Sequence, residues 1–94
     1  MKNDLSVLKA FYEMKSAFGQ AIYEKKQEQN LTYMQLEEMC NISHNYISDI
    51  VHGIVNISMM SMVKIAQGLE MPLSELFLRA DEIIKERYDK SILK

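Results

Sequence analysis

The stretch LTYMQLEEMCNISHNYISDIVHG, residues 31–53, contains two short helical patterns with a turn between them. Thr32 followed by Gln35 has the spacing of a capping box, in which the two side chains bond free N–H groups at a helix start. Asn41 suits the turn, because asparagine tolerates the left-handed backbone conformation better than most residues do. Ser43 can cap the next helix. The spacing therefore predicts two helices joined by a tight turn.

Apolar residues at helical spacing continue on both sides of this stretch. They predict a first helix over about 4–29, in which Ser16 and Gly19 are weak helix formers that allow a break. Ser58 can cap a fourth helix, and a fifth is expected over about 73–91. Strand alternation is absent, so the predicted fold class is all-α, with five helices and short connections. The residues expected to face the core are Val7, Phe11, Met14, Phe18, Ile22, Leu36, Met39, Cys40, Ile47, Ile50, Val51, Met59, Met62, Ile65, Ala66, Leu69, Leu76, Phe77, Ala80, Ile83, Ile84 and Tyr88.

The composition limits the classes of function. The chain has 94 residues, which suits one domain, and a formal net charge of −2. A dedicated nucleic-acid binder is more often basic, so this balance counts mildly against one. The single cysteine, Cys40, allows no internal disulfide, and a reducing compartment is the simplest context. No apolar run approaches the roughly 20 residues that span a bilayer. We therefore expect a soluble, cytoplasmic protein with no membrane partner.

The combined spacing resembles the Cro and phage-repressor type of helix-turn-helix domain, also called Xre-like. FGQAIYEKK resembles the first helix of that family, the stretch at 31–53 resembles its helix-turn-helix, and IAQGLEMPLSELF resembles its closing helices. The resemblance covers a core of about 18–77 without a gap, with the helix-turn-helix at about 32–53. It implies one five-helix, phage-repressor-like DNA-binding domain over 1–94, with extended N- and C-terminal helices.

The chain departs from the family pattern at several positions. Tyr33 stands where the family usually has a glutamine that touches phosphate, and Glu37 stands where it usually has alanine. Asn41 replaces the usual turn glycine. Val51 replaces a glutamate that often pairs with a basic residue of the first helix, and here that residue is still Lys26. Lys26 must therefore find another partner or point to water.

The family register predicts a DNA-reading face on the third helix. Residues at the start of that helix, and one turn on, face the major groove in helix-turn-helix proteins. Asn45 can bond adenine bidentately, Asp49 can accept from cytosine N4, and His44 can donate to a guanine acceptor or a phosphate. The alternative is an ordinary solvated helix face, and the family register favours the groove. The expected DNA-binding residues are Tyr33, Ser43, His44, Asn45, Tyr46, Ser48 and Asp49.

Charge opposes this interpretation. Between Leu31 and Val63 the charged side chains are Glu37, Glu38 and Asp49, with no Lys or Arg. Phosphate neutralisation supplies most non-specific affinity for DNA. Backbone N–H groups at the starts of the second and third helices, and the hydroxyls of tyrosines, can bond phosphate without a side-chain charge. The flanking lysines that can approach the backbone are Lys25, Lys26 and Lys64.

Two functional hypotheses remain after enzymes and metal proteins are set aside. No carboxylate pair, nucleophile–base arrangement or glycine-rich phosphate loop is found, so no enzyme and no cofactor are expected. His44 and His52 lie about 12 Å apart along one helix and cannot share a metal ion. The leading hypothesis is a sequence-specific transcriptional regulator that binds double-stranded DNA as a homodimer. The alternative is a protein-interaction module on the same scaffold, antitoxin-like or anti-repressor-like, with little DNA affinity and an unknown protein partner.

Apolar residues remain after the family core is filled, and they suggest self-association. They lie in the loop at 54–57 and in the C-terminal stripe of Ile83, Ile84, Tyr88 and Ile92. One interpretation is a dimer interface in the stripe, the loop or both. The other is internal packing, in which the stripe pairs with an N-terminal cluster and the loop packs under the fourth helix. The residues of that N-terminal cluster are Leu5, Leu8 and Phe11.

Overall fold

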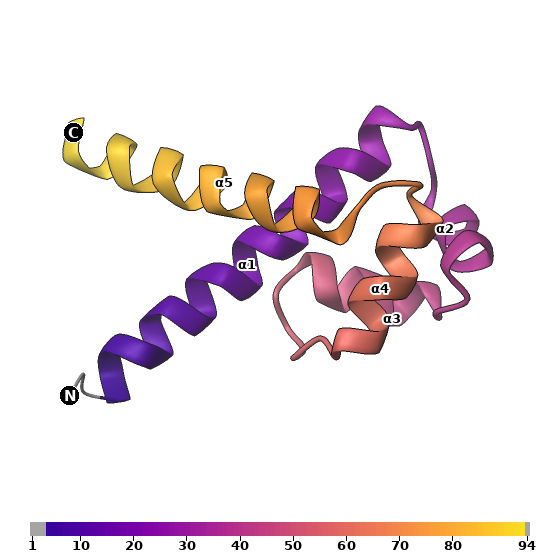
Figure 1. The fold of residues 1–94 in the computed structure, drawn as a ribbon, viewed down its shortest axis with the longest axis horizontal. Coiled ribbons are helices and arrows are strands. Elements are labelled where there is room, and N and C mark those ends of the chain that lie inside the picture. Colours follow the sequence, from indigo (N-terminus) through magenta and orange to yellow (C-terminus); the bar gives the residue numbers. More distant parts are fainter. Residues whose placement is uncertain (1–3, 94) are drawn as a thin grey trace.

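The computed structural model describes residues 4–93, and side chains as far as residue 90; over this range the chain forms five helices and no strand. The predicted five-helix, all-α fold is therefore confirmed (Figure 1). The long terminal helices cross each other, and the three short helices gather on one side of the crossing. The helices are α1 (Asp4–Glu28), α2 (Tyr33–Cys40), α3 (His44–Val51), α4 (Met59–Gly68) and α5 (Leu73–Leu93).

The short helices begin at the residues that their sequence predicts. At α2, Thr32 Oγ1 accepts from the Gln35 N–H at 3.1 Å, and Gln35 Oε1 accepts from the Thr32 N–H at 2.9 Å, which completes the capping box. Ser43 caps α3, and Ser58 caps α4 by accepting from the Ser61 N–H at 3.1 Å. These caps satisfy N–H groups that have no acceptor within their own helix.

α1 is continuous through Ser16 and Gly19, so the break that their low helix propensity allowed is not formed. Gly19 is instead a point of close approach between helices. A Cβ atom at this position would lie 2.6 Å from the carbonyl oxygen of Val51, at the end of α3. The glycine therefore lets the C-terminal end of α3 rest directly on α1, and this contact sets the position of α3.

Most of the predicted core is buried, in one cluster that all five helices share. Residues at 0% exposure include Ile22, Leu36, Ile47, Ile65 and Leu76, one from each helix. Other predicted core residues are exposed, because they lie on outward helix faces or beyond the crossing of α1 and α5. These corrections to the predicted core are Val7, Phe11, Met39, Met59 and Tyr88.

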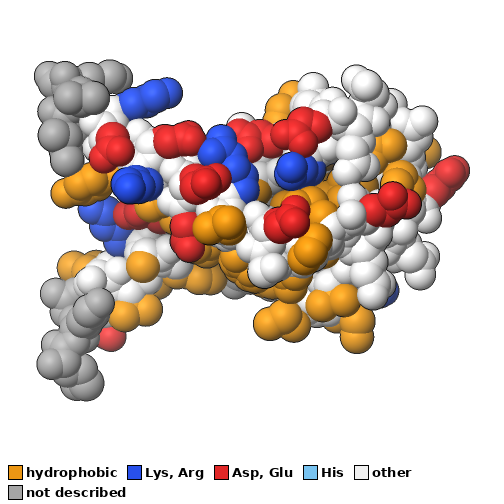
Figure 2. All heavy atoms as spheres, turned by 45° about the horizontal axis from the view of Figure 1, so that its top comes forward, with side chains coloured by type: hydrophobic (Ala, Val, Ile, Leu, Met, Phe, Trp, Pro, Cys, Tyr) orange, Lys and Arg blue, Asp and Glu red, His pale blue; other side chains and the backbone are white. Residues whose placement is uncertain are grey.

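The packing of α1 on α5 is tight only near their crossing. There the Phe18 and Phe77 rings have centroids 4.9 Å apart, and Arg79 binds Glu24 through two hydrogen bonds of 2.7 and 3.0 Å. Figure 2 shows acidic and basic side chains interspersed along this side of the molecule. Arg87 adds a bond of 3.1 Å to the Ser16 hydroxyl.

Beyond the crossing, the first half of α1 and the second half of α5 diverge as two arms (Figure 1). Leu5 is 77% exposed and Leu8 is 47% exposed on the α1 arm. The predicted internal pairing of these residues with the C-terminal stripe is therefore not formed by the described side chains. Ile83 is buried and Ile84 packs against the core, whereas the side chain of Ile92 lies outside the described residues.

Candidate nucleic-acid interface

The turn between α2 and α3 has the geometry that the sequence predicts. Asn41 adopts the left-handed conformation, with φ 56° and ψ 46°, and its N–H donates to the Glu37 carbonyl at 2.8 Å. Ser43 then accepts from the Tyr46 N–H at 3.2 Å and starts α3. Asparagine thus serves where the family usually has glycine, because it tolerates positive φ at low cost.

One face of α3 is fixed in the core, and this leaves the opposite face outward. Ile47 and Ile50 are buried, whereas Asn45 is exposed and Asp49 is partly exposed. Asn45, Asp49 and His52 follow at steps of four and three residues, so they share one side of the helix. This outward side carries two of the side chains that the sequence predicts as base-reading groups.

Glu37 occupies the start of α3. Its Oε1 accepts from the His44 backbone N–H at 3.0 Å and lies 2.6 Å from His44 Nδ1. These bonds to His44 hold the pKa of the Glu37 carboxyl below its usual range. The first N–H of α3, which we expected to bind phosphate, is therefore bonded to a carboxylate of the same chain.

Sequence reasoning missed this contact, although a signal was present. Glu37 replaces a small residue at the packing position beside the next helix, and a carboxylate there lies within reach of a helix N-terminus. Carboxylates are stabilised at such positions by the helix dipole and by free N–H groups. The acidic departure at this position thus indicated an internal cap.

Tyr33 and Ser48, two further predicted DNA-binding residues, interact with each other. The Tyr33 side chain is partly buried against the core. Burial is the main cause that raises the pKa of the Tyr33 hydroxyl above its usual value, and the Ser48 side chain lies close enough to lower this pKa slightly. The pair therefore joins the start of α2 to the middle of α3.

Lys26 packs against aromatic rings in place of the glutamate that the sequence lacks. Its ammonium lies 4.4 Å from the centroid of the Tyr33 ring and 5.6 Å from that of the Tyr23 ring, and it donates to Gln27 Oε1 at 3.1 Å. The residue is only 7% exposed, so the expectation that it approaches the DNA backbone is wrong. A cation over an aromatic face is stabilised by the ring's quadrupole and needs no carboxylate.

Contacts within the protein also hold Tyr46 and Lys25, which were predicted to lie near DNA, and the neighbouring His52. Tyr46 packs against the core with its ring partly buried. His52 Nδ1 donates to the Ser48 carbonyl at 2.7 Å. Lys25, another flanking lysine, pairs with Glu28 at 3.1 Å. Asn45 is thus the most open of the predicted base-reading side chains on α3.

Other candidate chemistry at this site is limited. Burial raises the pKa of the Cys40 thiol to about 11, and the side chain lies in the core. Within the described part of the chain, no group of three His, Cys, Asp or Glu side chains is placed to hold a metal ion. No described helix is both long enough and apolar enough to cross a membrane.

Comparison with known proteins agrees with this geometry. A family model described as "Helix-turn-helix" matches residues 22–76, which is more than half of the 94-residue chain. No curated protein matches the chain in sequence. Members of the matched family are DNA-binding transcription factors and not enzymes, which confirms the expectation on catalysis.

Several solved structures share the fold. The clp gene regulator ClgR from Corynebacterium glutamicum superposes with a TM-score of 0.81 over 85% of each chain, at 18% identity. A second structure of that regulator has a TM-score of 0.70 and 19% identity, and covers 73% of this chain and 90% of the other. The restriction-modification controller protein C.AhdI from Aeromonas hydrophila has a TM-score of 0.64 and 24% identity, over 65% of this chain and 92% of its own.

The family match contains the capped α2, the left-handed turn and the buried face of α3. It also ends near the buried Leu76, at the edge of the core that the sequence pattern indicated. The chain therefore belongs to the helix-turn-helix family of Cro/C1-type, Xre-like DNA-binding transcriptional regulators.

Proposed function

We propose that the protein is a sequence-specific transcriptional regulator that binds a two-fold operator as a homodimer. The outward face of α3 carries the proposal. It presents Asn45 and Asp49 from a helix whose opposite face is fixed by Ile47 and Ile50. Asn45 can bond adenine bidentately and Asp49 can accept from cytosine N4 in the major groove.

Phosphate contacts in this proposal depend on few charges. The start of α3 is occupied by Glu37, so its first N–H is not available. At the start of α2, the N–H groups of Tyr33 and Met34 have no acceptor within their helix, because they lie in its first turn. These groups can bond a phosphate oxygen without neutralising it by a side-chain charge. The affinity is therefore expected to depend weakly on salt.

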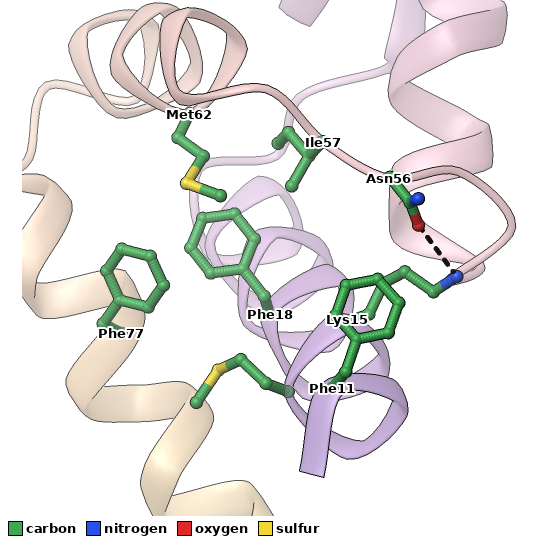
Figure 3. A pocket seen from close by; sticks show the side chains of 8 residues that line it. Phe11, Lys15, Phe18, Asn56, Ile57, Met62 and Phe77 are labelled. Atoms are coloured by element: carbon green, nitrogen blue, oxygen red, sulfur yellow. Dashed lines mark hydrogen bonds between the residues drawn. The ribbon is translucent and has the colours of Figure 1, made fainter. Parts of the chain in front are cut away.

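A hollow beside the α3–α4 loop supports the homodimer. It has a volume of about 190 Å³ and lies between α1, the loop, α4 and α5 (Figure 3). This is smaller than the roughly 300–1,000 Å³ of typical small-molecule sites, and it suits inserted apolar side chains. The residues that line it are Phe11, Met14, Lys15, Phe18, Asn56, Ile57, Met62 and Phe77.

Exposed apolar residues extend the hollow into a larger surface. Leu8 and Tyr12 flank Phe11 on the α1 arm, and Ile54 is 66% exposed in the adjoining loop. Lys15 closes one side by donating to Asn56 Oδ1 at 3.4 Å. Contiguous apolar surface of this kind typically marks an interface. A second copy offers the same apolar arm to the same hollow, which is the self-complementary contact of a two-fold dimer.

The test combines mass and affinity measurements. Light scattering on a chromatography peak is expected to give twice the 11.0 kDa chain mass. Fluorescence anisotropy is expected to show tighter binding to a duplex selected from random sequence than to its scrambled form. Asn45→Ala is expected to weaken binding to the selected duplex by about 1–3 kcal/mol and to leave binding to the scrambled duplex unchanged. Equal affinity for both duplexes would refute sequence specificity.

A protein-interaction module is the second candidate, and the acidic character of the motif favours it. Glu37 covers the start of α3, and no Lys or Arg lies between residues 31 and 63. If no duplex binds at low salt, and Asp49→Asn restores no binding, this second function replaces the first.

A further inference from the structure

We propose that Glu37 is a positioning residue that fixes the tautomer of His44 and thereby determines which base edge His44 recognises. The inference rests on the proposed placement of α3 in the major groove. It deepens that function by assigning specificity to a pair of residues, of which only His44 reaches the DNA.

The pair has a defined geometry. Glu37 Oε1 lies 2.6 Å from His44 Nδ1 and accepts from the His44 backbone N–H at 3.0 Å. One carboxylate oxygen thus holds both the ring and the start of its helix. An ionised carboxylate can only accept hydrogen bonds, so Nδ1 must carry the hydrogen. The side chain of Glu37 therefore selects one tautomer of the neutral ring.

The second nitrogen of the ring, Nε2, then sets what His44 offers to DNA. With the hydrogen on Nδ1, the neutral ring has an acceptor at Nε2. In the described structure, Nε2 makes no hydrogen bond, and no side-chain nitrogen or oxygen is both buried and unpaired. Nε2 is therefore accessible to an outside donor. In the major groove such donors are adenine N6 and cytosine N4.

A His44 ring with hydrogens on both nitrogens would have the opposite preference. Both ring nitrogens then donate, and Nε2 suits guanine O6 or N7 instead. The ring is faced by Glu37 from α2, whereas Lys26 of α1 is held over Tyr33. On α3 and at its C-cap, Asp49 and His52 lie about 7.5 and 12 Å further along the helix axis. Within the described chain, Glu37 is thus the titratable group that bonds the ring.

The first arm of the test observes the tautomer without DNA. Nitrogen-15 NMR of the free protein at about pH 8 is expected to show His44 with its hydrogen on Nδ1. Glu37→Gln keeps the size of the side chain, but its amide can accept or donate, so a mixture of tautomers is expected. Glu38→Gln is the matched control, because it removes the same charge from the adjacent, exposed residue.

The second arm measures base preference. His44→Ala first identifies the position of a selected duplex at which discrimination depends on His44. At that position the wild type and Glu38→Gln are expected to prefer A or C over G roughly two- to tenfold at about pH 8, the range of one net hydrogen bond. Glu37→Gln is expected to lose this preference at the same pH, because its amide no longer selects one tautomer.

The outcomes separate the inference from the function that it deepens. A hydrogen on Nε2 in the wild type would overturn the inference, whatever the DNA results are. The correct tautomer with a base preference unaffected by Glu37→Gln would also overturn it, while sequence-specific binding stands. If the wild type binds no duplex, both the proposed function and this inference are refuted.

Discussion

The ammonium of Lys26 lies 4.4 Å from the centre of the Tyr33 ring and replaces an ion pair that the sequence lacks. We expect Tyr33→Phe to destabilise the fold by at most about 0.5–1.5 kcal/mol, because it loses the interaction of the hydroxyl with Ser48 but keeps the ring. Tyr33→Leu should cost about 1–2 kcal/mol more, because the desolvated cation loses its aromatic face. Urea unfolding of the three proteins gives these differences, and equal losses for both variants would show that the ring does not stabilise Lys26.

The bidentate bond between Arg79 and Glu24 predicts a pH dependence of stability. The Arg79 hydrogen bonds are the main cause that holds the pKa of Glu24 below its ordinary value of 4.5. A depressed folded-state pKa stabilises the fold above the unfolded value, and this contribution is lost as pH falls through the folded value. Glu24→Gln should therefore lower the free energy of unfolding by on the order of 1 kcal/mol at pH 7. Its stability should also change less with pH below about pH 4.5. Glu82→Gln is the control, since Glu82 lies 3.5 Å from Arg79 and is more exposed; an equal change in both variants would contradict the assignment.

Gly19→Ala tests whether α3 is positioned by its close approach to α1. Alanine would improve helix propensity by up to about 1 kcal/mol. Its Cβ, however, would lie 2.6 Å from the backbone oxygen of Val51, which cannot rotate away as a side chain does. We expect the cost of overpacking to exceed this gain, so that the free energy of unfolding falls by about 1–3 kcal/mol in thermal or urea unfolding. A stabilised variant would show that α3 can shift on α1.

The proposed dimer surface predicts a contrast between two exposed leucines. Leu8→Glu adds a charge beside the apolar hollow, and should convert the dimer to a monomer without loss of helix content. Leu78 is 62% exposed, but it lies among Glu24, Lys25, Glu28 and Glu75, away from that hollow. Leu78→Glu should therefore remain dimeric. Light scattering gives the mass and circular dichroism the fold, and a dimeric Leu8→Glu variant would exclude the proposed surface.

The sequence predicted the local structure of the motif because each signal acts over a few residues. Thr32 with Gln35, Asn41 and Ser43 each bond backbone within four residues of themselves, and all adopt the predicted caps or turn. The exposed Val7 and Tyr88 were predicted as core, because periodicity identifies an apolar face but not what covers it. The arms diverge through tertiary geometry that the helical pattern does not contain.

The predicted site was harder to obtain from sequence for a related reason. The family register gave the outward face of α3, but which side chains remain free depends on contacts between helices. Tyr33 meets Ser48, and Glu37 meets His44, across sequence separations of fifteen and seven residues. Lys26 is buried by the rings of two tyrosines, which a count of flanking charges cannot show.

Asp49 provides the last prediction, because its charge acts on affinity and on specificity in opposite directions. Asp49 is partly exposed on the outward face of α3, and residues 31–63 contain no Lys or Arg. A negative charge near phosphates disfavours binding to any duplex, so Asp49→Asn should strengthen binding to scrambled DNA. The same change removes an acceptor that suits cytosine N4 and adds a donor, so the preference for the selected duplex should fall.

The slope of log affinity against log salt should stay shallow for both the wild type and Asp49→Asn, because each neutralised phosphate contributes about 0.9 to it and neither protein gains a cation. Anisotropy titrations over salt concentration, with Glu38→Asn as a control for loss of charge alone, give all three quantities. If Asp49→Asn and Glu38→Asn change affinity and preference equally, Asp49 does not face the bases.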